Sequence, residues 1–393
     1  MKLPISVFLS VFLFTAETTA ALYLSFTYGS SGDRIYRGFT LLFTLLPSVL
    51  VQLTLTFIHR DLQKDRPFVL LLHILQLGPI VRCLEAFYIY GSMGKVEEPY
   101  VSIIRKKRLP RGGAPPEEVE EQLGRAEGKI MTHRAAFARA SVVQAFMGSA
   151  PQLTLQAYIS LLHRAVPIRR GTMMVVSMLS MVYGALRCNL LAIKIKYDDY
   201  EVKIGPAAFL CIFLWRSLEI SSRVAVLVLV GSTLQLWVLP VVLADLLASS
   251  LHPWVQFWRS GAPFPEGVEK TLERAGTGVA LCLLTLLYGT ISVFCWPATD
   301  LDLAHADLIG RRENWRHPVT YYALRFAENV ILVMLWLAYQ KDFHQPPIAV
   351  LLGLHLLVGY AAGLVFMLVL YRFCHPCRRL YLSQGSCEQP GNP

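Results

Sequence analysis

The sequence predicts an all-α integral membrane protein. Stretches of about twenty apolar residues recur along the whole chain, and that is roughly the length an α-helix needs to cross ~30 Å of hydrocarbon. Apolar residues make up 54% of the 393 residues and charged residues only 16%, which is too few charges for a solvated surface. A membrane β-barrel would instead require short segments of alternating polarity, and the sequence has none.

Hydropathy predicts about ten membrane helices. The first apolar run continues through Leu22 and Phe26, so it is longer than the apolar core of a signal peptide, and we expect a retained helix rather than a cleaved leader. The ten predicted segments lie near residues 4–28, 38–58, 68–91, 141–163, 172–195, 207–231, 233–251, 277–299, 319–339 and 347–373.

One long connection, residues 92–140, separates the third and fourth segments. It carries ten Lys or Arg residues, including the run Arg105–Arg108, so we expect it to be cytosolic. Ten full crossings with a cytosolic N-terminus would place this loop outside. We therefore predict eight spanning and two re-entrant segments, with both termini cytosolic.

A weak internal repeat suggests which segments re-enter. The sequences TLLFTLLPSVLVQL (Thr40–Leu53) and TLQLWVLPVVLADL (Thr233–Leu246) share Thr, Leu, Leu-Pro, Val-Leu and Leu at matching positions, which predicts two five-segment pseudo-repeats. Pro47 and Pro240 each remove a helix hydrogen bond, so we nominate the second and seventh segments as broken and re-entrant. The third and eighth segments are the alternative.

This pattern divides the chain into five parts. They are residues 1–91 with three membrane segments, the basic loop 92–140, segments four and five in 141–206, the second repeat in 207–373, and a short cytosolic tail, 374–393.

Charged side chains inside apolar segments are the candidate functional residues, because each costs free energy there unless it is paired or hydrated. Three pairs share the spacing R-x-x-E, which places both charges on one helix face. The candidates are Glu17, Arg82, Glu85, Arg187, Arg216, Glu219, Arg325 and Glu328, with Arg223, Asp245 and polar residues such as Gln52, His73, Gln76, Gln144, Asn189, Asn329 and His355 alongside. Two interpretations stay open: structural ion pairs, or a polar track for lipid headgroups.

Several function classes find no support in the sequence. No nucleotide-binding, metalloprotease, serine-hydrolase or kinase motif is present, so we predict a non-enzymatic protein without a cofactor. The basic residues flank membrane segments, which explains the net charge of +10 without nucleic acid. Cys374 and Cys377 form a CHPC motif that is a poor zinc site, so we predict no metal; palmitoylation or an inert pair are the alternatives.

The cytosolic loop contains a candidate docking strand. Its segment EPYVSIIRKKRL, Glu98–Leu109, favours β-structure and offers a partner's sheet edge a strand through Tyr100, Val101, Ile103 and Ile104. The alternative is a solvated basic loop. Downstream, Pro115 and Pro116 precede four glutamates, a pattern typical of a helix start.

Long motifs throughout the chain resemble the XK-related family of membrane proteins. They include FLFTAETTAALYL (Phe12–Leu24), VQLTLTFIHRDLQKDRP (Val51–Pro67), LLHILQLGPIVRCLEAF (Leu71–Phe87), EEPYVS (Glu97–Ser102), GSAPQLTLQAYIS (Gly148–Ser160), YGALRCNLLAIKIKYDDYEVK (Tyr183–Lys203), FLWRSLEISSRVAVLVL (Phe213–Leu229) and FWRSGAPFPEGVEK (Phe257–Lys270).

The resemblance implies eight spanning and two re-entrant helices in two repeats, with phospholipid scrambling as the family activity. It also implies a chorein-type bridge-like lipid-transfer protein and the Kell endopeptidase as partners, in the plasma membrane or the endoplasmic reticulum. Residues Gln340–Val350 lack the family's cysteine for Kell, so that pairing would be non-covalent, and no aspartate after Asp342 offers a caspase site. A secondary transporter of amino acids or oligopeptides, or a membrane scaffold, remains the alternative.

Overall fold

A computed structural model describes residues 4–61, 67–93, 117–196, 204–262, 274–304, 308, 316–339 and 347–374. Within these residues the regular elements are helices, and no strand is present. Eight of the described helices are long and apolar enough to cross a membrane. The protein is therefore an all-α integral membrane protein, as the sequence predicts.

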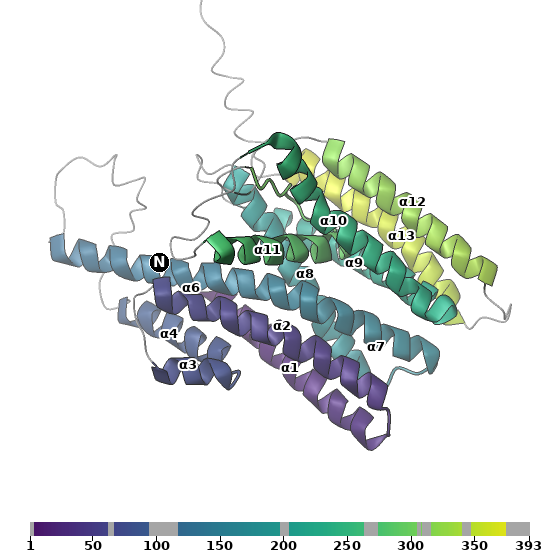
Figure 1. Cartoon of the computed structure of the whole chain (residues 1–393), viewed down its shortest axis with the longest axis horizontal. Coiled ribbons are helices and arrows are strands. Elements are labelled where there is room, and N and C mark those ends of the chain that lie inside the picture. The colour runs from purple at the N-terminus through teal and green to yellow at the C-terminus, as the bar shows by residue number, and fades with distance from the viewer. Residues whose placement is uncertain are drawn as a thin grey trace, which may run out of the picture. The chain divides into compact units, whose positions relative to one another are not determined.

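The chain folds as two compact units, residues 1–144 and 145–393. In the first unit α1 and α2 lie side by side, both contact α6, and α4 packs against α6 as well (Figure 1). Its core joins Val7, Phe14, Leu55 and Phe137, each at most 7% exposed. The helices are α1 (Ile5–Ser30), α2 (Arg34–Asp61), α3 (Pro67–Ile74), α4 (Gly78–Met93) and α6 (Glu117–Val143).

The second unit is built around α9, which is buried along most of its length. Helices α7, α8, α12 and α13 all contact α9, while α10 pairs chiefly with α11. A π-helical turn, η1 (Gln144–Ser149), joins α6 to α7. The other elements are α7 (Ala150–Leu162), α8 (Ile168–Lys196), α9 (Pro206–Leu234), η2 (Gln235–Trp237), α10 (Val238–Ser260), α11 (Arg274–Phe294), α12 (Arg316–Tyr339), α13 (Pro347–Val369) and η3 (Leu370–Cys374).

The predicted breaks in the second and seventh segments are wrong. Helix α2 continues through Pro47, and both α2 and α10 are long enough to span a membrane. Pro240 lies in the first turn of α10, where the missing N–H would have no helical partner in any case. Pro47 sits in an apolar helix packed against its neighbours, so the loss of one hydrogen bond does not end the helix.

The interruption falls in the third segment, which was the alternative. Helices α3 and α4 are separated by the turn at Leu75–Leu77, in which Gln76 has a positive φ of 65°. The eight residues of α3 rise only about 12 Å, which is less than half the hydrocarbon thickness. The eighth segment is also shorter than expected, because α11 ends at Phe294 and the chain continues without helix through Ala304.

The predicted helix start after the two prolines of the long loop is confirmed, since α6 begins at Glu117. The candidate docking residues Tyr100, Val101, Ile103 and Ile104 lie outside the described residues. The predicted strand there stays a prediction, as does the five-segment repeat.

Helices α10 and α11 lie close together at Gly289. A methyl group at this glycine would lie 2.1 Å from Ser250 Oγ and 3.0 Å from the Leu246 carbonyl oxygen. The serine side chain can rotate away, but the backbone carbonyl cannot. We expect Gly289→Ala to push the two helices apart and to destabilise the protein by about 1–3 kcal/mol.

The measurement is the thermal midpoint of the detergent-purified protein. Gly38→Ala is the matched control, because nothing lies within 4 Å of a methyl group at that helical position and the substitution favours helix. Equal midpoints for the two variants would show that Gly289 is not needed for the α10–α11 contact.

Candidate functional site: buried ion-pair networks

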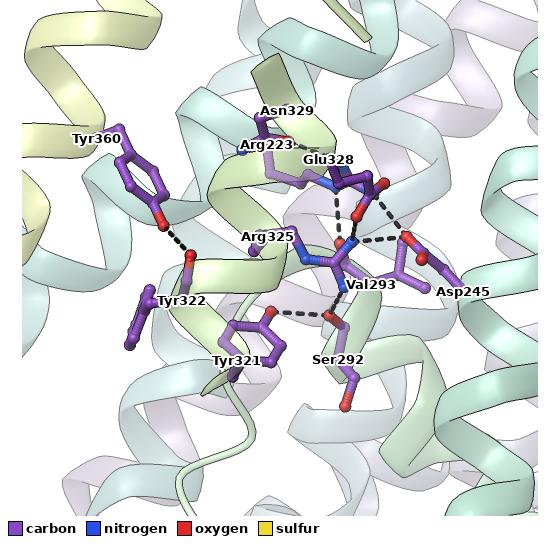
Figure 2. A network of polar contacts seen from close by, with 10 residues as sticks. All are labelled: Arg223, Asp245, Ser292, Val293, Tyr321, Tyr322, Arg325, Glu328, Asn329 and Tyr360. Atoms are coloured by element: carbon purple, nitrogen blue, oxygen red, sulfur yellow. Dashed lines mark hydrogen bonds and ion pairs between the residues drawn. The ribbon is translucent and has the colours of Figure 1, made fainter. Parts of the chain in front are cut away.

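Two arginines and two carboxylates meet among α9, α10 and α12 (Figure 2). Arg223 Nη2 donates to Asp245 Oδ2 at 2.7 Å and to Glu328 Oε1 at 2.5 Å. Arg325 Nη1 donates to Asp245 at 2.6 Å and also to Glu328. Arg223 Nη1 completes the group by donating to Asn329 Oδ1 at 2.8 Å. We call these five side chains the four-charge network.

The four-charge network also holds the end of α11. The last carbonyls of a helix have no hydrogen-bond donor within the helix. At the end of α11, side chains from α9 and α12 donate to these carbonyls. Arg325 Nη2 and the Tyr321 hydroxyl donate to the Ser292 carbonyl, both at 2.8 Å, and Arg223 Nε donates to the Val293 carbonyl at 3.0 Å. Positive charge at a helix C-terminus is favourable in addition, because the helix dipole is negative there.

The four-charge network carries no net charge, and its positive side chains are less exposed than its negative ones. The two cations match the two anions, so no net charge is buried. Arg223 is 2% exposed, whereas the side chains of Asp245 and Glu328 are 23% and 24% exposed. The guanidinium groups therefore form the interior of the network and the carboxylates its outer edge. Chemically, that edge offers a docking point to a cation such as an ammonium group.

A second group of contacts surrounds Glu219 on α9, and it reaches the non-helical chain after α11. Glu219 accepts from Arg216 Nη1 at 2.7 Å, from the Trp296 backbone N–H at 2.9 Å and from the Tyr322 hydroxyl at 3.0 Å. Arg216 also donates to Asn189 Oδ1 of α8 at 3.0 Å. Together, Arg216 and Glu219 fix α9 to three other parts of the second unit: α8, α12 and the chain after α11.

The aromatic surroundings of Arg216 explain how a fully buried guanidinium is tolerated. Its Cζ lies 4.1 Å from the ring centroid of Trp215 and 5.9 Å from that of Trp296. Arginine stacks on aromatic faces and is weakly hydrated compared with lysine. Arg216 is 0% exposed and Glu219 7% exposed, so this pair is a structural clamp with little access for a ligand.

In the first unit, a chain of hydrogen bonds links the broken third segment to α2. Arginine can only donate, so Arg82 Nε donates to His73 Nε2 at 3.3 Å, and His73 Nδ1 in turn donates to Gln52 Oε1 at 3.0 Å. Gln52 then donates to Gln76 Oε1 at 3.3 Å, and Ser48 also donates to that oxygen. The turn between α3 and α4 is thereby fixed to α2.

The series of hydrogen bonds from Arg82 to Gln76 can form only because residue 78 is a glycine, Gly78. A methyl group there would lie 2.0 Å from His73 Nδ1 and 2.2 Å from Gln52 Oε1. Only a residue without a side chain allows the first turn of α4 to approach the histidine so closely.

The other end of this chain reaches α6 through Glu85. Arg82 Nη1 donates to Glu85 Oε2 at 2.7 Å, and His133 Nε2 lies 3.4 Å from the same oxygen. His133 Nδ1 donates to the Lys129 carbonyl at 2.8 Å, which holds the buried ring in place. The hydrogen bond from His133 to Glu85 is the largest cause, and together with the one from Arg82 it lowers the pKa of Glu85 to about 2.

The remaining predicted residues lie apart from these groups. Glu17 is 2% exposed and accepts from Gln144 Nε2 at 3.0 Å, which links α1 to the residue that follows α6. Arg187 lies on α8, half-buried, in neither group of the second unit. The structure thus brings each R-x-x-E pair into contact and places Glu17, Arg82 and Glu85 in the first unit, with the other candidates in the second.

Sequence reasoning missed His133, Trp296 and Tyr322. His133 lies in the polar helix α6, where a histidine gives no signal of burial. Trp296 binds Glu219 through its backbone N–H, which no sequence pattern reveals. Within the described part of the chain, no cluster of three or more His, Cys, Asp or Glu residues has the proximity to hold a metal ion.

The Glu219 clamp predicts a rescue between two substitutions. Arg216→Met alone would leave a buried carboxylate without its cation, and breaking such a pair costs about 3–5 kcal/mol. Adding Glu219→Gln removes the charge but keeps an oxygen that accepts from Trp296 and Tyr322. We expect the double variant to be more stable than Arg216→Met, as measured by detergent-resistant monomer after heating. A double variant that is no more stable than the single one would contradict the pairing.

The low pKa of Glu85 predicts that the stability of the folded protein depends on pH. A lowered pKa in the folded protein contributes stability that is present above the ordinary pKa of 4.5 and is lost as the pH falls through about 2. Wild type should therefore exceed Glu85→Gln in thermal midpoint at pH about 6, and the difference should shrink below pH about 4. A difference that stays constant across this range would exclude an ionised Glu85 as its source.

Comparison with known proteins connects these networks to a family. The model of the family described as XK-related protein matches residues 5–376, which include every network above. The chain is 57% identical over 386 residues to "Endoplasmic reticulum membrane adapter protein XK" of Pan troglodytes, covering 98% of this chain and 87% of that protein. The Mus musculus protein of the same name is 55% identical, with 98% and 86% covered.

A more distant relative is "XK-related protein 8" of Tetraodon nigroviridis. It is 27% identical over 407 residues, which cover 98% of this chain and 85% of that protein. The matches extend over nearly the entire chain at both levels of identity. The chain therefore belongs to the XK-related protein family.

Proposed function

We propose that this protein is an adapter of the endoplasmic reticulum membrane and a phospholipid scramblase-type protein that works with a chorein-type bridge-like lipid-transfer protein. Two relatives that are 55–57% identical over almost the whole chain carry the name endoplasmic reticulum membrane adapter. An adapter needs a membrane part that fixes its position and a cytosolic part that binds its partner. The eight apolar helices meet the first need. The protein carries out no covalent chemistry in this proposal.

The observation that carries the lipid part of the proposal is the four-charge network. Three of the helices that are long enough to cross a membrane contribute charges to it, and its carboxylates are partly accessible. A zwitterionic headgroup carries an ammonium group and a phosphate. The ammonium group is complementary to Asp245 and Glu328, and the phosphate is complementary to the guanidinium groups behind them.

In the resting arrangement both arginines are already paired. A headgroup therefore has to exchange with existing ion pairs. This exchange changes the free energy little, because each broken ion pair is replaced by a similar one. Acyl chains can remain in lipid while the headgroup passes. By contrast, the Arg216–Glu219 pair is almost fully enclosed, and we assign it to structure.

The partner part of the proposal rests on the cytosolic loop. Its segment Glu98–Leu109 combines β-favouring residues with a basic run. A lipid bridge supplies or drains one leaflet only, so a scramblase at its end relieves the resulting imbalance. We propose that Tyr100, Val101, Ile103 and Ile104 add a strand to a sheet edge of the lipid-transfer protein.

The first test is lipid scrambling by the full chain in liposomes with fluorescent phospholipids. We expect dithionite to bleach more than the outer-leaflet half of the signal. The variant Arg325→Gln, Glu328→Gln keeps the network neutral while removing one pair from its edge, and it should slow scrambling at least about tenfold, or ~1.4 kcal/mol in barrier. The matched neutral control is Arg216→Gln, Glu219→Gln, which should scramble at the wild-type rate if folded.

The same preparations test the adapter part. Ile103→Pro removes a ladder donor and should abolish co-precipitation of the chorein-type protein, while charge reversal at Lys106 and Lys107 should weaken it less. Bleaching limited to the outer half for wild type would overturn scrambling by the isolated chain and leave the adapter role standing. Undiminished recruitment by Ile103→Pro would overturn the docking strand.

A further inference from the structure

Helices α9 and α13 pack against each other in antiparallel register. His355 Nε2 on α13 lies 2.9 Å from Ser221 Oγ on α9. A methyl group on Gly363 would lie 3.5 Å from Leu218 Cβ. Beyond the end of α13, the ring of Tyr371 meets that of Trp215 edge-on at 6.4 Å between centroids. Residue numbers thus fall along α9 as they rise along α13 and η3.

Continuing the same register brings two cysteines together. Cys211 precedes Trp215 by four residues, about one turn of α9, and Cys374 follows Tyr371 by three residues in η3, so the two cysteines lie at a similar height on the two antiparallel elements. Cys211 and Cys374 also pack against the same buried cluster, which contains Trp215 and Leu370. The helix register and this shared packing agree in placing the two cysteines near each other.

The local structure holds Cys374 firmly in this position. The last turn of α13 widens into the π-helical turn η3, and Leu370 at its start is 2% exposed in the core around α9. Cys211 and Cys374 both pack against that core. Both thiols are free and half-buried, so a small oxidant has access to them. Short π-helical turns occur frequently at functional sites.

We propose that Cys211 and Cys374 form a reversible disulfide that fastens the end of α13 to the first turns of α9. The oxidant is a hydroperoxide, with hydrogen peroxide as the simplest case. Its O–O bond breaks, an S–S bond forms, each sulfur gives up one electron, and the two thiol protons leave in two molecules of water. A cellular dithiol reverses the reaction by thiol–disulfide exchange.

The bond would restrain the central helix of the second unit. Cys211 lies two helical turns before Glu219, so a covalent link at this end limits how far α9 can slide or rotate against α13. The dithiol form leaves that motion open. Because the two cysteines are far apart in the sequence, the closed bond should also raise thermal stability.

The test uses the full-length protein in detergent micelles, treated with hydrogen peroxide, blocked with N-ethylmaleimide and digested without reductant. We expect mass spectrometry to find a linked peptide containing Cys211 and Cys374, formed at the same rate after tenfold dilution and lost with dithiothreitol. Oxidation should raise the thermal midpoint of wild type and leave that of Cys211→Ser unchanged.

Cys377→Ser is the matched control, because Cys377 is the other cysteine of the CHPC motif, and this variant should still form the linked peptide. A peptide joining Cys374 to Cys377 instead would overturn the proposal. So would oxidation of Cys374 to a sulfinic acid, or its modification by a fatty acyl chain in protein purified from cells, with Cys211 still free.

Discussion

The constraint on which the second unit depends is that a charge in a membrane helix needs a partner within the protein. Helix α9 carries three such charges, Arg216, Glu219 and Arg223, and each one binds at least one neighbouring element. Glu219 holds the chain after α11, Arg216 holds α8, and Arg223 holds α10, α12 and the end of α11. Packing alone would let apolar helices slide. The directed bonds of α9 fix one arrangement.

Hydropathy was sufficient to predict the class of fold and the positions of the eight helices that are long and apolar enough to cross a membrane. It failed at the level of single prolines, where Pro47 and Pro240 suggested breaks that are not present. A proline interrupts a helix only when the packing allows the chain to leave, and packing is not visible in a sequence. The true interruption lies where Gln76 takes a left-handed conformation and Gly78 permits close approach to His73.

The candidate site shows a similar division. The R-x-x-E spacing is local, so one helix turn is enough to bring Arg216 to Glu219, and the pairing follows from geometry that the sequence contains. Contacts between helices are different in kind. No local pattern announces that Arg223 reaches the Val293 carbonyl or that Trp296 offers its backbone N–H, because these depend on the tertiary arrangement.

The capping of α11 by side chains from α9 and α12 has a consequence for the connection that follows it. In many helices the residues just beyond the C-terminus satisfy the last carbonyls, so the sequence of the loop is constrained. Here Arg223 and Arg325 satisfy them from across the unit. The side chains of the non-helical residues 296–304 are thereby relieved of that task. Side-chain substitutions in this stretch that leave the Trp296 backbone N–H in place would keep the end of α11 intact.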